Sequence, residues 1–363
     1  MINKEIEING KTLKISTGQV AKQAAGSVMV SYGETTIIVA VNAAREMRED
    51  IDFFPLQVEY RERHYAGGKI PGGFFKREAR PSEREVLTSR LTDRPIRPLF
   101  PKSFKYETQV IITVLTTDGE NPSDVLAGVG ASAALMVSNI PWNGPIATVR
   151  LAKVDEDFVV NPTKLQMEES SMELVVSGNK DTIVMVEGEA DLIAEDVFVN
   201  ALKFAHEDIK KIIALQEEIA KEVNPEKRDI PEDKANDKLN AAVDKSLGDK
   251  INDIIQLVDK SERESATSQL HQDTLESLEE KFPENEKEVK KLIDDKFKTA
   301  FRNKVLDTGV RSDGRSTTDI RDITIDPSFL PRTHGSVLFT RGETQALVVT
   351  TLGSKRDEQI IDS

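Results

Sequence analysis

The 363-residue sequence contains no cysteine, which excludes disulfide bonds, thiolate metal sites and cysteine nucleophiles and fits a reducing compartment. It also lacks an apolar run of the roughly 18 residues that a membrane-spanning helix requires. The N-terminus, Met1-Ile2-Asn3-Lys4-Glu5, has no apolar core of the kind that a signal peptide needs. We therefore expect a protein that contacts no membrane and works in the cytoplasm.

Signatures of nucleotide and metal sites are equally scarce. No glycine loop of the Walker type and no dinucleotide-binding fingerprint occurs. The chain has four histidines, and none of them stands at a spacing typical of metal ligands. They are His64, His206, His271 and His334. The residues themselves thus predict neither a metal site nor a nucleotide cofactor.

The chain carries 49 Lys and Arg residues against 63 Asp and Glu residues, a formal net charge of −14. Taken over the whole molecule, this charge argues against nucleic-acid binding, because a polyanion needs local positive charge. Basic residues are, however, concentrated between positions 61 and 105. The start of this segment is rich in residues that predict a flexible, exposed loop: Gly67, Gly68, Pro71, Gly72 and Gly73.

Two adjacent phenylalanines, Phe74 and Phe75, follow directly on this loop and precede Lys76 and Arg77. An aromatic face can stack on any nucleobase, and neighbouring cations can hold phosphates. The combination predicts binding of single-stranded nucleic acid without sequence preference. The alternative, in which both rings pack beneath the loop and the charges are only solvated, stays open at this point.

Three further arginines are candidates for contacts with the same strand. Arg90 and Arg94 stand four residues apart and therefore share a helix face, and Arg97 follows just beyond. Structural ion pairs are the other interpretation, and the pattern alone favours them. The acidic residues available for such pairs are Glu83, Glu85 and Asp93.

Strand-like and helix-like patterns alternate over the first part of the chain, up to about residue 220. Strands are predicted at 11–17, 27–32, 35–41, 108–115, 146–154, 172–177 and 182–186. Helices are predicted at 124–138, where the residues are apolar on all sides, and at 189–223, where the apolar period is 3.6 residues.

A capping box marks the start of another helix, with Ser82 as N-cap and Glu85 three residues later. We expect this helix to run to about Asp93 and to end before Pro95, since proline disfavours helical backbone at the residue before it.

Composition changes after Asn224-Pro225. From 226 to 303, many charges of both signs accompany apolar residues at helical spacing, which predicts a solvated helical bundle that acts as a spacer or packing module. A polar loop at 311–315 follows, and β-like patterning returns at Ile323.

One stretch of sequence occurs twice. Gly26-Ser27-Val28 followed by Gly33-Glu34-Thr35 returns 309 residues later (33 to 342) as Gly335-Ser336-Val337 followed by Gly342-Glu343-Thr344. This period is far longer than that of solenoid repeats, so it indicates a duplicated domain. The alternative is that two unrelated hairpins use the same turn residues. Because the second copy extends over roughly one hairpin, we expect the chain to be the front part of a longer protein.

Three runs of residues are specific enough to suggest a family: Ile-Pro-Gly-Gly-Phe-Phe-Lys-Arg-Glu at 70–78, Arg-Leu-Thr-Asp-Arg-Pro-Ile-Arg-Pro-Leu-Phe at 90–100, and Phe-Thr-Arg-Gly-Glu-Thr-Gln-Ala-Leu at 339–347. They resemble bacterial polynucleotide phosphorylases, and the resemblance covers essentially the whole chain. It implies an α+β fold with an RNase PH-like core (ribosomal protein S5 domain 2-like) at 1–224, subdivided near 143. An all-helical domain at 225–307 and the start of a second RNase PH-like core at 308–363 would follow.

The resemblance also implies an activity, a phosphate-dependent 3′-to-5′ exoribonuclease that releases nucleoside diphosphates and runs in reverse as a template-independent RNA polymerase. Inorganic phosphate would be a substrate and Mg²⁺ a cofactor bound by the second core. The implied partners are single-stranded RNA, two further copies in a ring-shaped homotrimer, and proteins of an RNA-degradation complex. Two alternatives stay open: a non-catalytic RNA-binding ring or scaffold protein of exosome-like type, and an interaction platform that uses the acidic helical segment.

In this family the catalytic motifs lie in the second core, beyond Ser363, so we expect no catalytic residue and no metal ligand in this chain and no activity from it alone. The first core keeps a basic pair, Lys76 and Arg77, although the family's usual residue at the first of these positions is arginine. Lysine retains the charge and loses the bidentate phosphate geometry, which predicts weaker and more salt-dependent binding.

At two other positions, which correspond to the phosphate loop and the metal site of the second core, the first core has residues unsuited to catalysis. The phosphate-loop position reads Asn-Pro-Ser-Asp at 121–124, where Pro122 lacks an N–H donor and Asp124 places negative charge at a helix N-terminus. The metal position corresponds to Met167, Glu173 and Val175, which retain a single carboxylate, whereas Mg²⁺ needs several oxygen ligands. We infer a first core that kept its hold on RNA, through Phe74, Phe75, Lys76, Arg77, Arg90, Arg94 and Arg97, and lost phosphorolysis.

Overall fold

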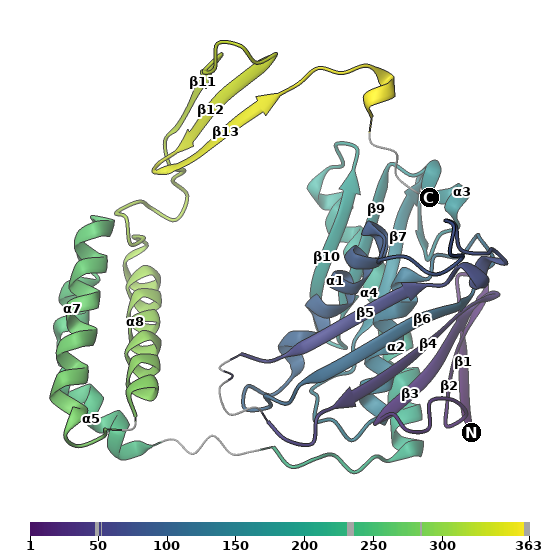
Figure 1. Ribbon diagram of the computed structural model, residues 1–363, viewed down its shortest axis with the longest axis horizontal. Helices are drawn as coiled ribbons and strands as arrows, with labels where there is room; N and C mark the ends of the chain where they lie inside the picture. Colours follow the sequence, from purple (N-terminus) through teal and green to yellow (C-terminus); the bar gives the residue numbers. More distant parts are fainter. Residues whose placement is uncertain (48–50, 52, 231–235, 284, 359–363) are drawn as a thin grey trace. The chain divides into compact units, whose positions relative to one another are not determined.

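The computed structural model describes residues 1–47, 51, 53–230, 236–283 and 285–358 (Figure 1). The chain forms two compact units, Met1–Asp233 and Lys234–Ser363. Strands and helices occur in both, so the predicted α+β class is confirmed. None of the described helices is long and apolar enough to cross a membrane.

A six-stranded sheet with the order β1-β2-β3-β4-β6-β5 forms one layer of the first unit. Its strands are β1 (Ile2–Ile8), β2 (Lys11–Thr17), β3 (Gly26–Tyr32), β4 (Thr35–Ala43), β5 (Leu56–Glu62) and β6 (Thr108–Thr116). All neighbours are antiparallel except β5 and β6, which run parallel. The strands predicted from alternation at 11–17, 27–32, 35–41 and 108–115 are all confirmed.

A second sheet, ordered β10-β9-β7-β8, completes the strands of this unit. It consists of β7 (Ala147–Val154), β8 (Asp157–Val160), β9 (Met172–Gly178) and β10 (Ile183–Ala190). The helices are η1 (His64–Gly67), α1 (Glu83–Ile96), η2 (Arg97–Leu99), α2 (Asp124–Val137), α3 (Lys164–Glu168) and α4 (Glu195–Val223). Ser82 caps α1 in a full capping box with Glu85, as the sequence predicts.

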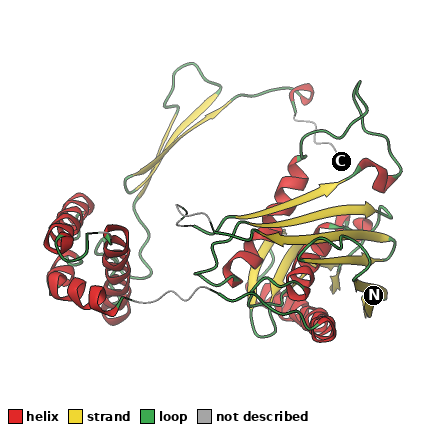
Figure 2. Ribbon diagram, turned by 60° about the horizontal axis from the view of Figure 1, so that its bottom comes forward, coloured by secondary structure: helices red, strands yellow, loops and turns green. Residues whose placement is uncertain are grey.

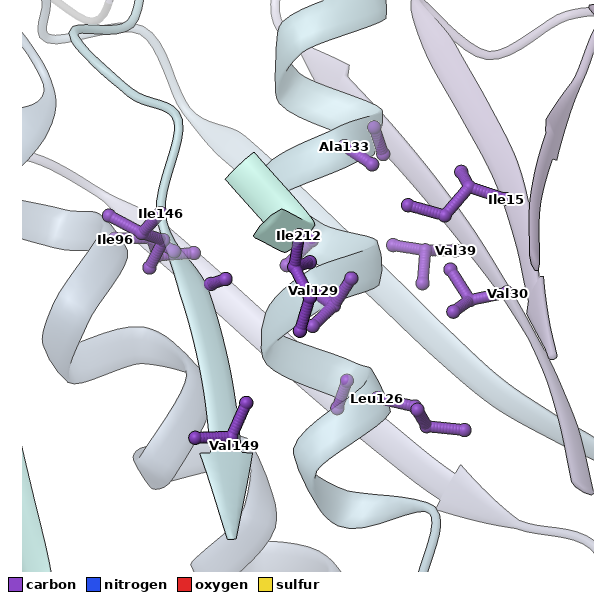
Figure 3. Close-up of a cluster of buried hydrophobic side chains, with 14 of the residues drawn as sticks. Ile15, Val30, Val39, Ile96, Leu126, Val129, Ala133, Ile146, Val149 and Ile212 are labelled. Atoms are coloured by element: carbon purple, nitrogen blue, oxygen red, sulfur yellow. The ribbon is translucent and has the colours of Figure 1, made fainter. Parts of the chain in front are cut away.

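Helix α2 forms the centre of the core, as its uniformly apolar sequence predicts. Figure 3 shows residues of α2 packed among side chains of the large sheet and of the elements behind it: Leu126, Val129, Ala133, Ile15, Val30, Val39, Ile146, Val149 and Ile212. The glycines of α2 permit this close packing. A Cβ on Gly130 would lie 2.6 Å from Val39 Cγ2, and a Cβ on Gly128 would lie 2.3 Å from Thr148 Oγ1.

Two predicted helix boundaries are wrong. Helix α1 continues through Pro95 to Ile96, because proline in a last turn removes only one hydrogen bond and the Arg97 N–H still bonds to Asp93 O. Helix α4 begins at Glu195 instead of residue 189. The residues before it, Glu189 and Ala190, pair with β9 as the end of β10, so sheet pairing overrides the helical period there.

The second unit begins with a small helical bundle, visible as red helices in Figure 2. Its helices are α5 (Asp237–Leu247), α6 (Lys250–Ile254), α7 (Lys260–Glu279) and α8 (Glu286–Thr308), and they share a modest apolar core. Residues 226–230 are not helical, so the helical segment starts later than predicted. The proposed domain boundaries after residues 224 and 307 stay predictions.

The repeated sequence forms the same hairpin twice. A three-stranded sheet, β11 (Ile323–Pro327), β12 (Gly335–Arg341) and β13 (Thr344–Thr350), is followed by a short turn, η3 (Lys355–Asp357). The pairing of β12 with β13 reproduces that of β3 with β4, residue for residue, at the 309-residue offset (33 to 342). The turn glycines have the same left-handed backbone, with φ of +59° at Gly33 and +60° at Gly342.

Candidate nucleic-acid interface

A long loop between β5 and α1 carries the predicted aromatic and basic residues. Its stem is fixed to the large sheet, because the Thr117 N–H donates to the carbonyl of the buried Ala66 over 3.1 Å. Both ends of the loop meet at Glu78, whose carboxylate accepts from the His64 N–H at 3.1 Å and contacts His64 Nδ1 at 2.8 Å. These hydrogen bonds lower the pKa of Glu78. One carboxylate therefore closes the base of the loop.

The two phenylalanine rings project from this loop into solvent. Phe74 is 92% exposed and Phe75 is 73% exposed, so the alternative in which both rings pack beneath the loop is wrong. The rings contact each other edge to face, with centroids 5.4 Å apart and planes at 87°. The Arg77 guanidinium lies over the Phe75 ring at 5.0 Å, and Lys76 adopts a left-handed backbone with φ of +49°. Aromatic faces and positive charge thus share one exposed tip.

The three arginines of α1 and η2 have different surroundings. Arg90 is exposed and makes no hydrogen bond or ion pair with any residue that the structure describes. Arg94 forms an ion pair with Glu187 of β10, with both side chains about half exposed. Arg97 donates to both oxygens of Asp93 at 2.7 and 2.8 Å.

Arg97 also donates to two backbone carbonyls at the start of β5, Phe54 O just before the strand and Leu56 O at its first residue, each at 3.1 Å. Its nitrogens therefore already have protein acceptors. Of the seven predicted RNA-binding residues, Arg97 makes the most hydrogen bonds to the protein itself, whereas Arg90 makes none to the residues that the structure describes. The RNA contacts of all seven stay predictions.

The segment equivalent to a phosphate loop is filled by protein contacts. Asn121 accepts a hydrogen bond from Lys11 Nζ at 2.7 Å, and Ser123 Oγ shares one with the Tyr60 hydroxyl at 2.7 Å. Burial raises the pKa of Tyr60, so its hydroxyl stays protonated. Although burial of Asp118 opposes ionisation, hydrogen bonds from the segment, Asn121 above all, hold the pKa of Asp118 well below its usual range. The segment has few donors left for an incoming anion.

The position equivalent to a metal site is unsuitable for Mg²⁺. Glu173 forms an ion pair with Arg150, and the Val175 side chain packs with Val125 and Met185 in a small apolar cluster. Met167 contributes a thioether, not an oxygen. Among the described residues, no group of three or more His, Asp or Glu side chains could hold a metal ion. A single carboxylate that already faces a guanidinium does not meet the needs of an octahedral oxygen site.

Sequence reasoning missed two elements of these sites. Nothing in local spacing connects His64 with Glu78 across the loop. Arg150 did give a signal, because it is the lone charge in the stretch Ala147-Thr148-Val149-Arg150-Leu151-Ala152 of a buried strand. A buried arginine needs carboxylate partners, and that requirement could have led to Asp124 and Glu173.

Comparison with known families assigns most of the chain. The model described as "3' exoribonuclease family, domain 1" matches residues 9–141, and "3' exoribonuclease family, domain 2" matches residues 144–208. A third model, "Polyribonucleotide nucleotidyltransferase, RNA binding domain", matches residues 238–316. The matched segments therefore cover most of the first unit and the helical bundle of the second.

Curated relatives agree with these matches. Proteins named polyribonucleotide nucleotidyltransferase are 46% identical over 357 residues in Heliobacterium modesticaldum and 48% identical over 370 residues in Thermomicrobium roseum. The alignments cover 98% and 99% of this chain but 50% and 47% of those proteins. A solved structure of an Archaeoglobus fulgidus exosome is 20% identical, covers 60% of this chain and 89% of its own, and has a TM-score of 0.47. The chain spans about half the length of the curated relatives it matches.

Proposed function

This chain belongs to the 3′ exoribonuclease family, and its curated relatives are polyribonucleotide nucleotidyltransferases; from that premise we propose that it is the RNA-holding part of a phosphate-dependent 3′-to-5′ exoribonuclease. In the proposed reaction an oxygen of inorganic phosphate attacks the phosphorus of the last phosphodiester bond of RNA. The bond from that phosphorus to the 3′ oxygen of the preceding nucleotide breaks, and a nucleoside diphosphate leaves. The reverse reaction extends RNA without a template.

The observation that carries this proposal is the exposed tip of the loop between β5 and α1. Phe74 and Phe75 expose their rings to solvent, and Arg77 lies over one of them. Bases of any identity stack on such rings, while Arg77, Lys76 and Arg90, which has no ion-pair partner among the described residues, attract phosphates. The hydrogen bonds between Glu78 and His64 hold the two ends of the loop together, which shortens the free chain that carries the tip.

The proposal assigns no catalytic role to the first core, residues 1–224. Its phosphate-loop equivalent is bonded to Lys11 and Tyr60, and its metal-site equivalent is paired with Arg150. We place the catalytic centre, its Mg²⁺ and its phosphate site in the second core, of which this chain contains β11 to β13. The family model matched at 238–316 supports a further RNA contact by the helical bundle.

The assembled enzyme, on this proposal, is a cytoplasmic homotrimer with RNA threaded through its centre. It degrades mRNA, alone or with proteins of an RNA-degradation complex. Positive charge gathered at the loop tip, in a chain of net charge −14, would guide a polyanionic strand toward one entrance.

RNA binding is tested with the 363-residue chain and a fluorescein-labelled oligoadenylate in an anisotropy titration. We expect Phe74→Ala together with Phe75→Ala to weaken binding by about tenfold or more, since stacking contributes ~1–3 kcal/mol per base. Leu165→Ala, which removes an equally exposed apolar side chain from α3, is the matched control and should leave the affinity unchanged. Unchanged affinity in the double variant would contradict the role of the loop tip.

The reaction is tested with the full-length protein, poly(A), Mg²⁺ and inorganic phosphate. We expect ADP as product, strict dependence on phosphate, and no product from residues 1–363 alone. Release of AMP without phosphate would contradict phosphorolysis. If the full-length protein binds RNA but degrades none, the alternative of a non-catalytic ring protein is favoured. The ion pairs of Arg150 with Asp124 and Glu173, at the metal-site equivalent of the first core, are the observation behind this alternative.

A further inference from the structure

A buried triad of charges joins the helix and the sheet of the first core at the equivalent of a metal site. Arg150 stands on β7, is 9% exposed, and forms ion pairs with Asp124, the first residue of α2, and with Glu173 on β9. Asp124 is nearly as buried, while Glu173 is more exposed. The guanidinium thus bridges two carboxylates that come from different elements.

The position of the guanidinium is fixed from several sides. The Arg150 backbone N–H donates to Asn161 Oδ1 at 3.0 Å, and the Arg150 carbonyl accepts from the Asn161 N–H at 2.7 Å. Each terminal nitrogen of Arg150 faces one carboxylate, whereas the buried Nε has no hydrogen-bond partner among the described residues. The Arg150 side chain is therefore oriented so that its two terminal nitrogens bond to the carboxylates while its Nε–H is left without an acceptor.

Two carboxylates that converge on one buried cation would repel each other if that cation were removed. In oxygen-rich sites a divalent metal ion performs the same task of holding carboxylates together. Here the neighbouring side chains, Val125, Val175 and Met185, supply no additional oxygen. The arrangement suits a planar monocation with paired donors better than a metal ion that needs about six oxygen ligands.

We propose that Arg150 is a built-in cation that takes the place of a divalent metal ion in the first core. The guanidinium neutralises Asp124 and Glu173 and ties the start of α2 to the sheet, so the first core folds and keeps its shape without metal. A Mg²⁺ requirement of the whole protein then arises outside the first core. This inference concerns the folding of residues 1–224 and is independent of RNA turnover.

Unfolding of the 363-residue chain, followed by tryptophan fluorescence, provides the test. Trp142 is the only tryptophan of the sequence, is buried in the first core, and donates its indole N–H to Ile96 O at 3.0 Å, so it reports on this core. Thermal unfolding is measured in EDTA and in increasing MgCl₂ or MnCl₂. We expect the melting temperature of the wild-type first core to be the same in all of these solutions.

Arg150→Ala leaves Asp124 and Glu173 facing each other without a cation. We expect its melting temperature in EDTA to fall by about 10 °C and to recover by several degrees in MgCl₂ or MnCl₂, because the freed carboxylates then bind the ion. Arg94→Ala, which removes the exposed ion pair with Glu187, is the matched control. It should change the melting temperature little and confer no response to metal.

Three results would overturn the proposal: an unchanged melting temperature in Arg150→Ala, a lowered melting temperature in a still-folded Arg150→Ala that neither ion raises, or a wild-type first core that either ion stabilises. If Arg150→Ala folds only with metal, the proposal is supported. If it folds under neither condition, the triple variant Arg150→Met, Asp124→Asn, Glu173→Gln decides, because it removes all three charges together. A folded, metal-insensitive triple variant supports charge neutralisation by Arg150, and an unfolded one overturns it.

Discussion

Two copies of one hairpin, β3–β4 in the first unit and β12–β13 in the second, have the same turn and the same register but opposite environments. Val39 on β4 is fully buried, whereas its counterpart Val348 on β13 is 52% exposed. Helix α2 covers the first copy, and none of the residues described in the second unit covers the second copy to the same degree. Turn and register are therefore encoded within the hairpin, while burial is supplied by chain far away in the sequence.

The largest expected contrast comes from placing a carboxylate at equivalent positions of the two copies. Val39→Asp puts an unpaired charge under α2 and should cost about 4 kcal/mol or more of the unfolding free energy of the first unit. Val348→Asp places the same group on an exposed strand and should cost less than about 0.5 kcal/mol. Urea denaturation followed by Trp142 fluorescence and circular dichroism measures both. Equal costs would show that the second copy is covered in solution.

The covering helix can be weakened instead of the hairpin. Lys227 donates to three carbonyls at the C-terminal end of α2, Leu135 O at 3.0 Å, Met136 O at 3.2 Å and Ser138 O at 2.7 Å. Lys227→Met leaves them without this donor and should destabilise the first unit by about 2 kcal/mol. Urea denaturation is again the measurement, with the exposed Lys221→Met as control. A loss no greater than that of the control would mean that water replaces the lysine.

The two hairpins can also be compared through the glycine in each turn, Gly33 and Gly342. Gly33→Ala and Gly342→Ala both force alanine into a left-handed backbone, at a cost of roughly 1 kcal/mol each. The first should lose more, about 2 kcal/mol in total, because a Cβ on Gly33 would lie 2.7 Å from Asn121 Nδ2 and 2.9 Å from Asp118 Oδ2. On Gly342 the nearest atom, at 3.0 Å, belongs to the flexible Arg321 side chain. Amide hydrogen exchange within each hairpin measures the two losses, and a larger loss at Gly342 would contradict this reasoning.

The contribution of Lys227 to the stability of the first unit should also depend on pH. Burial lowers the pKa of Lys227 to about 8 from its ordinary value of 10.5. Between these values the unfolded chain binds more protons at this side chain than the folded chain, so its contribution to stability rises with pH from about 8 to about 10.5. Wild type should therefore gain stability relative to Lys227→Met across this range in parallel denaturation series. A constant difference would indicate that the three carbonyls restore the ordinary pKa.

Features encoded within a few residues could be predicted from the sequence. The alternation of 35–41 gave β4, the pair Ser82 and Glu85 gave the start of α1, and the apolar run at 124–138 gave α2. The prediction at Pro95 failed because a proline in the last turn leaves the closing hydrogen bond from Arg97 N–H to Asp93 O intact, and the prediction at residue 189 failed because Glu189 and Ala190 pair with β9. Tertiary contacts override local preference at such boundaries.

In the candidate site, too, features set by neighbouring residues could be predicted, whereas features set by distant partners could not. The glycines and the proline at 67–73 predict an exposed loop, and Phe74 and Phe75, which follow them, are exposed. Arg97 could not be assigned from the sequence, since its carbonyl acceptors on Phe54 and Leu56 lie more than 40 positions away. Arg150 differs from Arg97, because a lone charge in a buried strand signals a need for carboxylate partners, although those partners, Asp124 and Glu173, lie 26 and 23 positions away.

The perpendicular arrangement of Phe74 and Phe75 restricts the path of any strand that both rings hold. Two neighbouring bases in a continuous stack lie nearly parallel, so they cannot each lie flat on rings whose planes meet at 87°. A strand seated on both rings has to break its stack between two nucleotides and turn a corner there. A duplex would have to unpair to make that corner, so on the proposed function the loop tip would favour unpaired RNA.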